Sequence, residues 1–305
     1  MSLLPESIRV IERGWLSANN IVFHEGSSAT LVDSGYLTHA AETLALVDRA
    51  LEGRTLARLI NTHSHSDHIG GNATLRRVHG CRILVPEGMA PAVADWDEDA
   101  LLLTTAHQQA EPFEFDATLA PGDALEMGGL VWRALPVPGH DMHALAYHCA
   151  AERILIPGDA LWRDGFGVMF AELHGDNSGL PAQRRTLEML RELDVAVVIP
   201  GHGAPFADHA AAVDRALARL AAFEQSPERM AKSAMKALFT FTLLEKRRMK
   251  RAEIGGYFGQ VAIFRDVSKR FFGREPAAVA AQVIDELVKA GILIEQDGDI
   301  VARGH

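Results

Sequence analysis

Apolar residues in the first two-thirds of the chain form short runs that alternate with stretches of helical spacing. Residues 8–13, 20–24 and 29–32 are three such runs in close succession, and we expect them to form an antiparallel meander of strands. Residues 37–51 and 69–78 instead repeat an apolar side chain every three or four positions, which is typical of amphipathic helices. The pattern therefore predicts a protein of the α/β class.

The alternation of strands and helices continues beyond the middle of the chain. A helix is predicted at residues 181–193, where Pro181 takes a favourable position in the first turn. Further buried strands are predicted at residues 56–60, 81–85, 131–137, 145–149, 153–156 and 195–199. Histidine or aspartate follows several of these strands closely, so polar side chains are expected where the strands end.

The end of the chain has a pattern of its own. Residues 230–244 and 277–290 have the apolar spacing of amphipathic helices, and Gly291 follows the second one at a position where helices often end. Residues 292–301 then form two short apolar runs around an Asp-Gly pair, which predicts a β-hairpin. Helices followed by a terminal hairpin indicate a second, smaller unit.

Charge divides the chain at nearly the same place. Residues 1–226 contain 16 basic and 30 acidic side chains, whereas residues 227–305 contain 14 basic and 10 acidic ones. The change coincides with the sequence Gln225-Ser226-Pro227, which reads as a linker. A chain of 305 residues can hold two domains. We therefore predict a first domain at residues 1–226 and a second at residues 227–305.

Composition indicates the compartment. Nearly half of the residues (48%) are apolar, which is enough to bury a sizeable core. The two cysteines, Cys81 and Cys149, form no disulfide pattern, as expected in a reducing compartment. The N-terminus lacks the basic and apolar segments of a signal peptide, and no apolar stretch is long enough to cross a bilayer. We expect a soluble cytoplasmic protein without a membrane partner.

The candidate chemistry is concentrated directly after the predicted strand at residues 56–60. Three histidines and one aspartate, His63, His65, Asp67 and His68, fall within six residues there. Neutral imidazoles and a carboxylate are suitable ligands for zinc, manganese or iron. The alternative is a solvated polar loop, but such a loop has no reason to place four potential ligands at this spacing.

The pattern His-x-His-x-Asp-His resembles the signature of the metallo-β-lactamase superfamily. Further motifs occur in the order typical of that family: Leu-Val-Asp-Ser-Gly at 31–35, Pro-Gly-His at 138–140, Pro-Gly-Asp at 157–159 and Pro-Gly-His-Gly at 200–203. The resemblance extends over residues 8–210. It implies an αββα sandwich, in which two sheets lie between layers of helices and metals are bound at one sheet edge.

The resemblance also implies a set of metal ligands. His63, His65 and His140 are expected to hold one divalent ion, and Asp67, His68 and His202 a second ion, with Asp159 bridging both. Zinc is the expected metal, and iron and manganese are alternatives. Asp67 and Asp159 are the expected catalytic carboxylates. Two cations so close together need a shared negative charge, and they can ionise a water that attacks the substrate.

Two further residues are expected beside the ligands. The carboxylate of Asp33 is predicted to hydrogen-bond the ligand loop and orient an imidazole, although a turn cap at a strand end is the alternative. His143 lies three residues after His140 and could hydrogen-bond a ligand or carry a proton, with a purely structural role as the alternative.

Two segments are candidates for the walls of a substrate pocket. Trp162, Phe166 and Phe170 follow Asp159 closely and are predicted to contact an apolar or planar substrate group, with core packing as the alternative. Residues 86–115 form an acidic insertion with aromatic side chains, which reads either as a lid or as a solvated pair of helices.

The resemblance favours a hydrolase of small thioesters, esters or lactones, similar to hydroxyacylglutathione hydrolase. Two features depart from glyoxalase II: the spacing of His143, and the terminal hairpin, which resembles the small winged-helix domain of some β-lactamase-like hydrolases. The β-lactamases of the superfamily carry Cys or Ser in place of the bridging Asp159 and are exported, which argues against antibiotic hydrolysis here.

Other functions stay open at this point. The basic run at residues 246–251 on a winged helix is compatible with a nuclease that binds phosphates, but the first domain is acidic and has no basic clamp. A mononuclear iron persulfide dioxygenase and a binding protein with a vestigial metal site are further alternatives. The expected partner is a small-molecule substrate, with nucleic acid less favoured and a homodimer left open.

Overall fold

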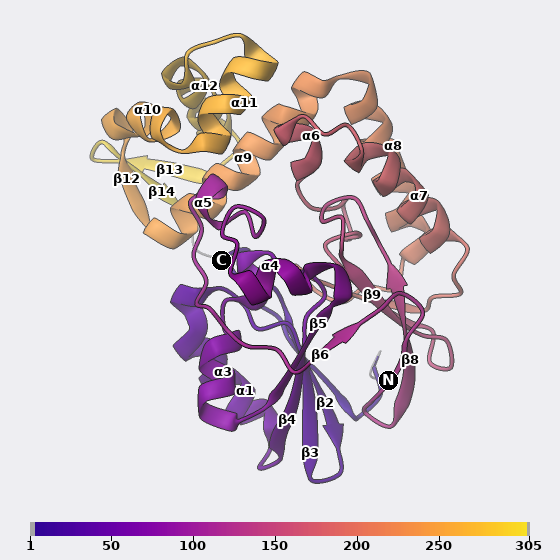
Figure 1. Cartoon of the computed structure of the whole chain (residues 1–305). Coiled ribbons are helices and arrows are strands. Elements are labelled where there is room, and N and C mark those ends of the chain that lie inside the picture. The colour runs from indigo at the N-terminus through magenta and orange to yellow at the C-terminus, as the bar shows by residue number, and fades with distance from the viewer. Residues whose placement is uncertain (1–3, 304–305) are drawn as a thin grey trace.

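Two β-sheets lie at the centre of the computed structural model, which describes residues 4–303 (Figure 1). The six strands of the first sheet are β1 (Ile8–Ile11), β2 (Asn20–Glu25), β3 (Ser28–Val32), β4 (Thr55–Ile60), β5 (Arg82–Pro86) and β6 (Ala117–Leu119), and they lie in that order. The first three strands are antiparallel, as the apolar runs predicted, and β3 to β6 are parallel.

The second sheet has the strand order β11-β10-β9-β8-β7. Its strands are β7 (Ala124–Met127), β8 (Leu130–Pro136), β9 (Leu145–Cys149), β10 (Ile154–Gly158) and β11 (Val197–Pro200). The pair β10 and β11 is parallel, whereas the other neighbours in this sheet are antiparallel. The two sheets pack face to face, because Phe23 of β2 and Trp132 of β8 meet in one apolar cluster with ring centroids 5.3 Å apart.

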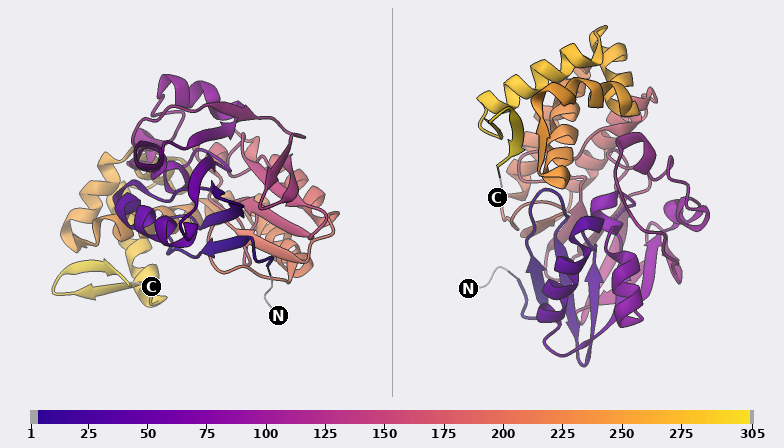
Figure 2. Two further views of the ribbon diagram at one scale, coloured as in Figure 1. Left: turned by 90° about the horizontal axis from the view of Figure 1, so that it is seen from below. Right: turned by 90° about the vertical axis from the view of Figure 1, so that its left-hand side faces the viewer.

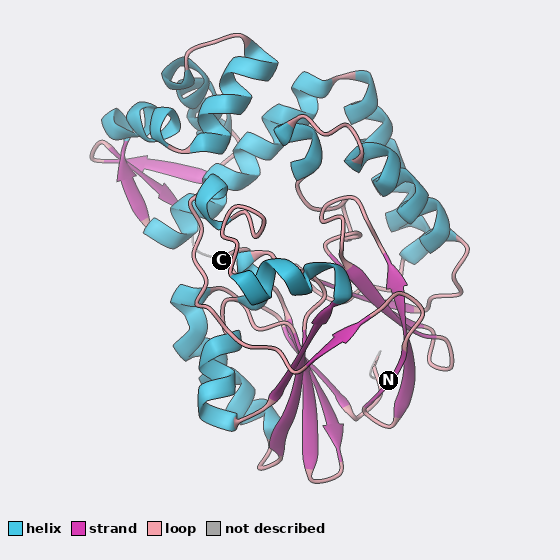
Figure 3. Cartoon of the chain, in the orientation of Figure 1, coloured by secondary structure: helices cyan, strands magenta, loops and turns pink. Residues whose placement is uncertain are grey.

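Helices cover the outer face of each sheet, which confirms the predicted αββα sandwich (Figure 3). On the first sheet, α1 (Ala40–Leu51) and α3 (Asn72–His79) pack with strand residues in one cluster. On the second sheet, α7 (Gly179–Arg191) and α8 (His209–Gln225) do the same. Short helices complete this part: η1 (Leu37–His39), α2 (Ser66–Ile69), η2 (Glu87–Met89), α4 (Ala90–Asp95), α5 (Leu103–Ala106) and α6 (Phe170–His174).

The C-terminal region consists of four helices and a small sheet at one end of the molecule (Figure 2). Its elements are α9 (Pro227–Lys246), β12 (Arg248–Lys250), α10 (Arg251–Gln260), α11 (Ala262–Phe272), α12 (Pro276–Lys289), β13 (Leu293–Gln296) and β14 (Asp299–Ala302). The predicted hairpin is present. Its turn residues Asp297 and Gly298 have φ of 53° and 80°, and two positive φ angles are what a two-residue hairpin turn needs.

A single residue, Ser226, separates α8 from α9. Its hydroxyl accepts a hydrogen bond from the backbone of Arg229 and so caps the start of α9. Phe223 of α8 and Phe239 of α9 belong to the same apolar cluster, which continues into α10, α11 and α12. The predicted boundary thus falls between two helices that share a core, and the division into two domains stays a prediction. Within residues 4–303, no helix is long and apolar enough to cross a membrane.

Candidate metal centre

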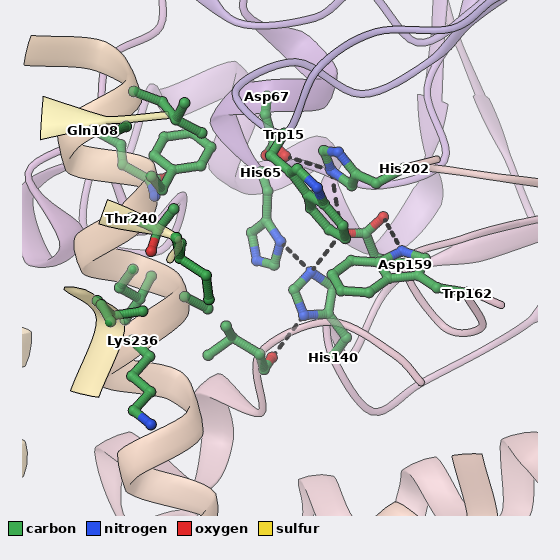
Figure 4. Close-up of a pocket in the computed structure, with 18 of the residues that line it drawn as sticks. Trp15, His65, Asp67, Gln108, His140, Asp159, Trp162, His202, Lys236 and Thr240 are labelled. Atoms are coloured by element: carbon green, nitrogen blue, oxygen red, sulfur yellow. Dashed lines mark hydrogen bonds and ion pairs between the residues drawn. The ribbon is translucent and has the colours of Figure 1, made fainter. Parts of the chain in front are cut away.

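The predicted ligands come from four loops that meet at one edge of the sheets (Figure 4). The loop after β4, together with α2, carries His63, His65, Asp67 and His68, whereas the other three ligands follow strands of the second sheet. His140 comes after β8, Asp159 directly after β10 and His202 after β11. All seven side chains are buried. Residues far apart in the sequence are therefore brought together because each follows a strand that ends at this edge.

The seven side chains form two groups. The ligand atoms of His63, His65 and His140 lie within 4.8 Å of one another. The same holds for Asp67, His68, Asp159 and His202.

Asp159 lies between these groups. Its Oδ2 is 3.6 Å from Nε2 of His140 in the first group, and its Oδ1 is 3.5 Å from Nε2 of His68 in the second. The carboxylate therefore stands where a bridging ligand is needed.

The unpaired nitrogens fit divalent metal ions. Nε2 of His63 and Nε2 of His68 are buried without a hydrogen-bond partner among the described residues, which is costly for polar atoms unless a ligand contacts them. Nε2 of His202 faces the second group as well, 2.9 Å from Oδ2 of Asp67 and 3.7 Å from Oδ2 of Asp159. In addition, Nδ1 of His65 and Nε2 of His140 face each other at 2.7 Å, so at most one proton fits between them. The nitrogen lone pairs of His65 and His140 therefore point toward one place, as the ligands of a cation do.

The surroundings of the candidate ligands shift the pKa values of His63 and His68 in opposite directions. Burial lowers the pKa of His63 well below its ordinary value, and the neighbouring imidazoles lower it further, so its nitrogen keeps a lone pair. Burial also acts to lower the pKa of His68, but Asp33, Asp67 and Asp159 outweigh it and raise that pKa well above the ordinary value. A cation in the second group would therefore replace a proton on His68.

Asp33 lies behind the ligands and orients them. Its Oδ1 accepts a hydrogen bond from the backbone of Thr62 at 2.9 Å, and its Oδ2 accepts from Nδ1 of His68 and from the Thr62 hydroxyl, both at 2.8 Å. Because the Thr62 hydroxyl donates to Asp33, its oxygen can accept the Nδ1 proton of His63, 3.0 Å away. Both imidazoles thereby present Nε2 to the site.

Two glycines leave space for the ligands. A Cβ at Gly201 would collide with Oδ1 of Asp159 and approach Cε1 of His68 at 3.0 Å. A Cβ at Gly167 would collide with the ring of His140. These positions therefore require glycine because of close approach.

Of the predicted pocket residues, Trp162 and Phe170 line a cavity of about 410 Å³ beside the ligands. The indole of Trp162 donates a hydrogen bond to Asp159, and the ring of Phe170 lies 5.0 Å from that of His65. Phe166 lies elsewhere. It is fully buried, packs edge-on against Phe223 and stays in the core, so its predicted pocket role was wrong.

His143 is also outside the site. Its side chain is exposed, and its ring lies over Gly88, where an added Cβ would collide with it. No hydrogen bond joins this ring to a predicted ligand in the described part of the chain. His143 does not line the cavity beside the ligands either, so the expected contact with a ligand is not formed.

Sequence reasoning missed two residues that contact the site. Trp15 stacks on His202 with ring centroids 5.3 Å apart and an interplanar angle of 8°, and 48% of its surface is exposed beside the cavity. Asn19 is buried, and its amide donates to the carbonyls of Pro200 and Gly203, on either side of His202. Both precede β2 in a segment without a recognisable motif, so no local signal identified them.

Comparison with known proteins agrees with this geometry. The family model of the metallo-beta-lactamase superfamily matches residues 13–202, which is more than half of the chain. The chain therefore belongs to the metallo-beta-lactamase superfamily.

Hydroxyacylglutathione hydrolases from Bradyrhizobium sp. (strain ORS 278) and Rhodopseudomonas palustris (strain BisA53) are 34% and 32% identical to the chain over 148 residues. Each match covers 45% of this chain and 51% of the relative, so the chain spans about half the length of the curated relatives it matches.

Two solved structures share the fold. A metallo-beta-lactamase family protein from Thermus thermophilus has a TM-score of 0.60 at 21% identity, and the match covers 99% of this chain and 100% of that one. A metallo-beta-lactamase from Cronobacter sakazakii has a TM-score of 0.58 at 18% identity, with coverage of 72% and 94%. At these identities the likeness concerns the fold alone.

Proposed function

We propose that the protein is a metal-dependent hydrolase that holds two divalent ions and cleaves a small thioester, ester or lactone. The observation that carries this proposal is the place of Asp159 between two groups of buried ligands. The similarity to hydroxyacylglutathione hydrolases supports a thioester as the first substrate to test.

The residues would divide the work as follows. His63, His65 and His140 would hold one ion, Asp67, His68 and His202 the other, and Asp159 both. Two such ions lower the pKa of a water and polarise the attacked carbonyl. Asp33 fixes the orientation of His68, and Trp162 holds one oxygen of Asp159. The rings of Trp15 and Trp162 pack edge to face beside the site, with centroids 5.2 Å apart.

Zinc is the proposed metal, because imidazole nitrogens and carboxylate oxygens are among its usual ligands. We also propose that residues 227–305 form a winged-helix-like module. Its support is the succession of α10, α11 and α12 followed by the hairpin, with a third strand, β12, pairing on β14.

A cytoplasmic location is part of the same proposal. Cys81 and Cys149 are both free and buried, which is the state that a reducing compartment maintains.

The test compares the wild-type protein with Asp159→Ala. Metal content is measured by elemental analysis, the fold by circular dichroism, and turnover with S-lactoylglutathione together with short ester and lactone substrates. We expect about two metal ions per chain and turnover in the wild type. The variant should keep the fold but lose metal and turnover. Full activity of Asp159→Ala, or a wild type that binds no metal, would contradict the proposal.

A further inference from the structure

The cavity beside the ligands has a second wall that belongs to the C-terminal region. It is formed on α9 by Ala237, Thr240, Phe241 and Leu244, across the cavity from His65 and Asp159 (Figure 4). Leu287 of α12 and Ile292 extend this wall. The predicted metal ligands and the C-terminal helices thus enclose one space.

The four wall residues lie at positions 237, 240, 241 and 244, which is the spacing of one face of an α-helix. None of the four side chains is fully buried. A different face of α9, including Met235, Phe239 and Leu243, is buried in the core. The helix is therefore apolar on the side that packs and largely apolar on the side that faces the cavity, where a solvated helix would carry charges.

Charged groups are scarce on this wall. Lys236 reaches the cavity, but its ammonium pairs with Glu286, which also pairs with Lys232. Arg303 is an exposed residue at the end of the described chain. The wall therefore has no row of free cations for a phosphate backbone within residues 4–303, and its chemistry does not favour a nucleic-acid strand as the occupant.

We propose that this wall binds an apolar acyl group of the substrate and so determines specificity, which rests on the proposed hydrolase function. A carbonyl bound beside Asp159 has an acyl group on one side and a leaving group on the other. An apolar acyl group matches the α9 wall better than a charged leaving group such as glutathione does. A cavity of about 410 Å³ falls within the range of about 300–1,000 Å³ that holds drug-sized ligands. It is larger than a short hydroxyacyl group such as lactoyl requires. Medium-length alkyl or aryl acyl groups match the wall in size and polarity.

The first experiment keeps the thiol constant and varies the acyl group. Glutathione thioesters of lactate, acetate, hexanoate and phenylacetate are compared on the metal-loaded protein. We expect kcat/KM for hexanoyl to exceed that for lactoyl by about tenfold or more, because the wall removes the added methylenes from water. Equal values for lactoyl and hexanoyl would overturn the specificity while leaving the hydrolase function intact.

The second experiment uses variants of the wall. Leu244→Gln should lower kcat/KM for hexanoyl about fivefold or more while changing acetyl little, and Ala237→Leu should shift the preference to shorter acyl groups. Val78→Gln is the matched control, because Val78 is an exposed apolar residue on α3, outside the cavity. If both wall variants keep the wild-type order of acyl groups, the proposal is wrong.

The third experiment needs no turnover. Binding of S-hexylglutathione and S-methylglutathione, which lack a carbonyl and cannot be hydrolysed, is measured by calorimetry on the metal-loaded protein. We expect the hexyl compound to bind about tenfold more tightly, and Leu244→Gln to remove the difference. Equal binding, or no binding of either compound, would overturn the proposal. Chain-length-dependent binding without any thioester turnover would instead place the failure in the proposed function.

Discussion

The indole nitrogen of Trp162 donates a hydrogen bond to Oδ1 of Asp159 at a distance of 3.0 Å. The acceptor belongs to the carboxylate that lies between the two ligand groups, and the donor lines the cavity. One tryptophan therefore connects the wall that substrate would touch with the group that both metal ions would share.

Trp162→Phe tests this connection, because it keeps an aromatic ring and removes the donor. A hydrogen bond to a charged acceptor contributes about 1.5–3 kcal/mol, so we expect kcat to fall about tenfold or more. Metal content, measured in parallel, should change little because the seven ligands remain. The control is Trp96→Phe, which alters an indole outside the cavity. Equal kcat for the wild type and Trp162→Phe would refute a positioning role.

Asp33→Asn tests the support behind the ligands. The substitution removes the charge that holds His68 and the Thr62 hydroxyl, and such changes commonly weaken metal binding about 10–100-fold. Competition with a chromogenic chelator measures the affinity. Asp164→Asn serves as the control, since the side chain of Asp164 is 82% exposed. An unchanged metal affinity in Asp33→Asn would show that Asp33 acts only at the strand end.

Gly201→Ala should destabilise the protein and the site together. The added Cβ would displace Asp159, and overpacking of this kind costs about 1–3 kcal/mol in the free energy of unfolding. Gly256→Ala is the matched control, because nothing lies within 4 Å of the added Cβ on α10 and alanine favours a helix by about 0.5–1 kcal/mol. Thermal unfolding and metal analysis should therefore separate the two variants, and similar melting temperatures would contradict the steric explanation.

Glu286 makes stability depend on pH. Its hydrogen bonds with Lys236 and Gln282, and a further one with Lys232, lower its pKa to about 2 from 4.5. A carboxylate with a lowered pKa stabilises the fold above its ordinary pKa, and this contribution is lost as the pH falls from 4.5 toward 2. Because these groups are about one-third exposed, we expect only about 1 kcal/mol.

Urea unfolding at several pH values measures this contribution. Between about pH 5 and about pH 3 the wild type should lose more of its free energy of unfolding than Glu286→Gln does. Glu253→Gln, on an exposed part of α10, should behave as the wild type. The same slope in all three proteins would show that the pairs between α9 and α12 add no stability.

The positions of the candidate ligands could be predicted because each lies in a short motif that follows a buried strand, and strand ends meet at a sheet edge. Asp159 and His202 illustrate this, since they closely follow two parallel neighbours, β10 and β11. The position of Phe166 could not be predicted in the same way. The chain turns between Gly165 and Gly167, and Phe166 enters the core while Phe170 reaches the cavity.

Contacts between distant segments escaped prediction for a related reason. The helix α8 is rich in alanine, which gives a weak apolar period, and it was not expected from the pattern.

Leu244 was correctly placed on a helix, but its spacing does not say whether it meets the core or a cavity. Which side chains of α9 meet the core and which line the cavity depends on how the helix packs in three dimensions. The second wall of the cavity could therefore be identified only from the structure.

One apolar face of α9 packs in the core and the other lines the cavity, so substitutions on the two faces should have different consequences. Phe239 belongs to the core, whereas Ala237 and Leu244 line the cavity. We therefore expect substitutions of Phe239 to impair folding more than substitutions of Ala237 or Leu244. If the wall binds the acyl group as proposed, a few positions on one helix would be enough to change the substrate while the ligand residues stay the same.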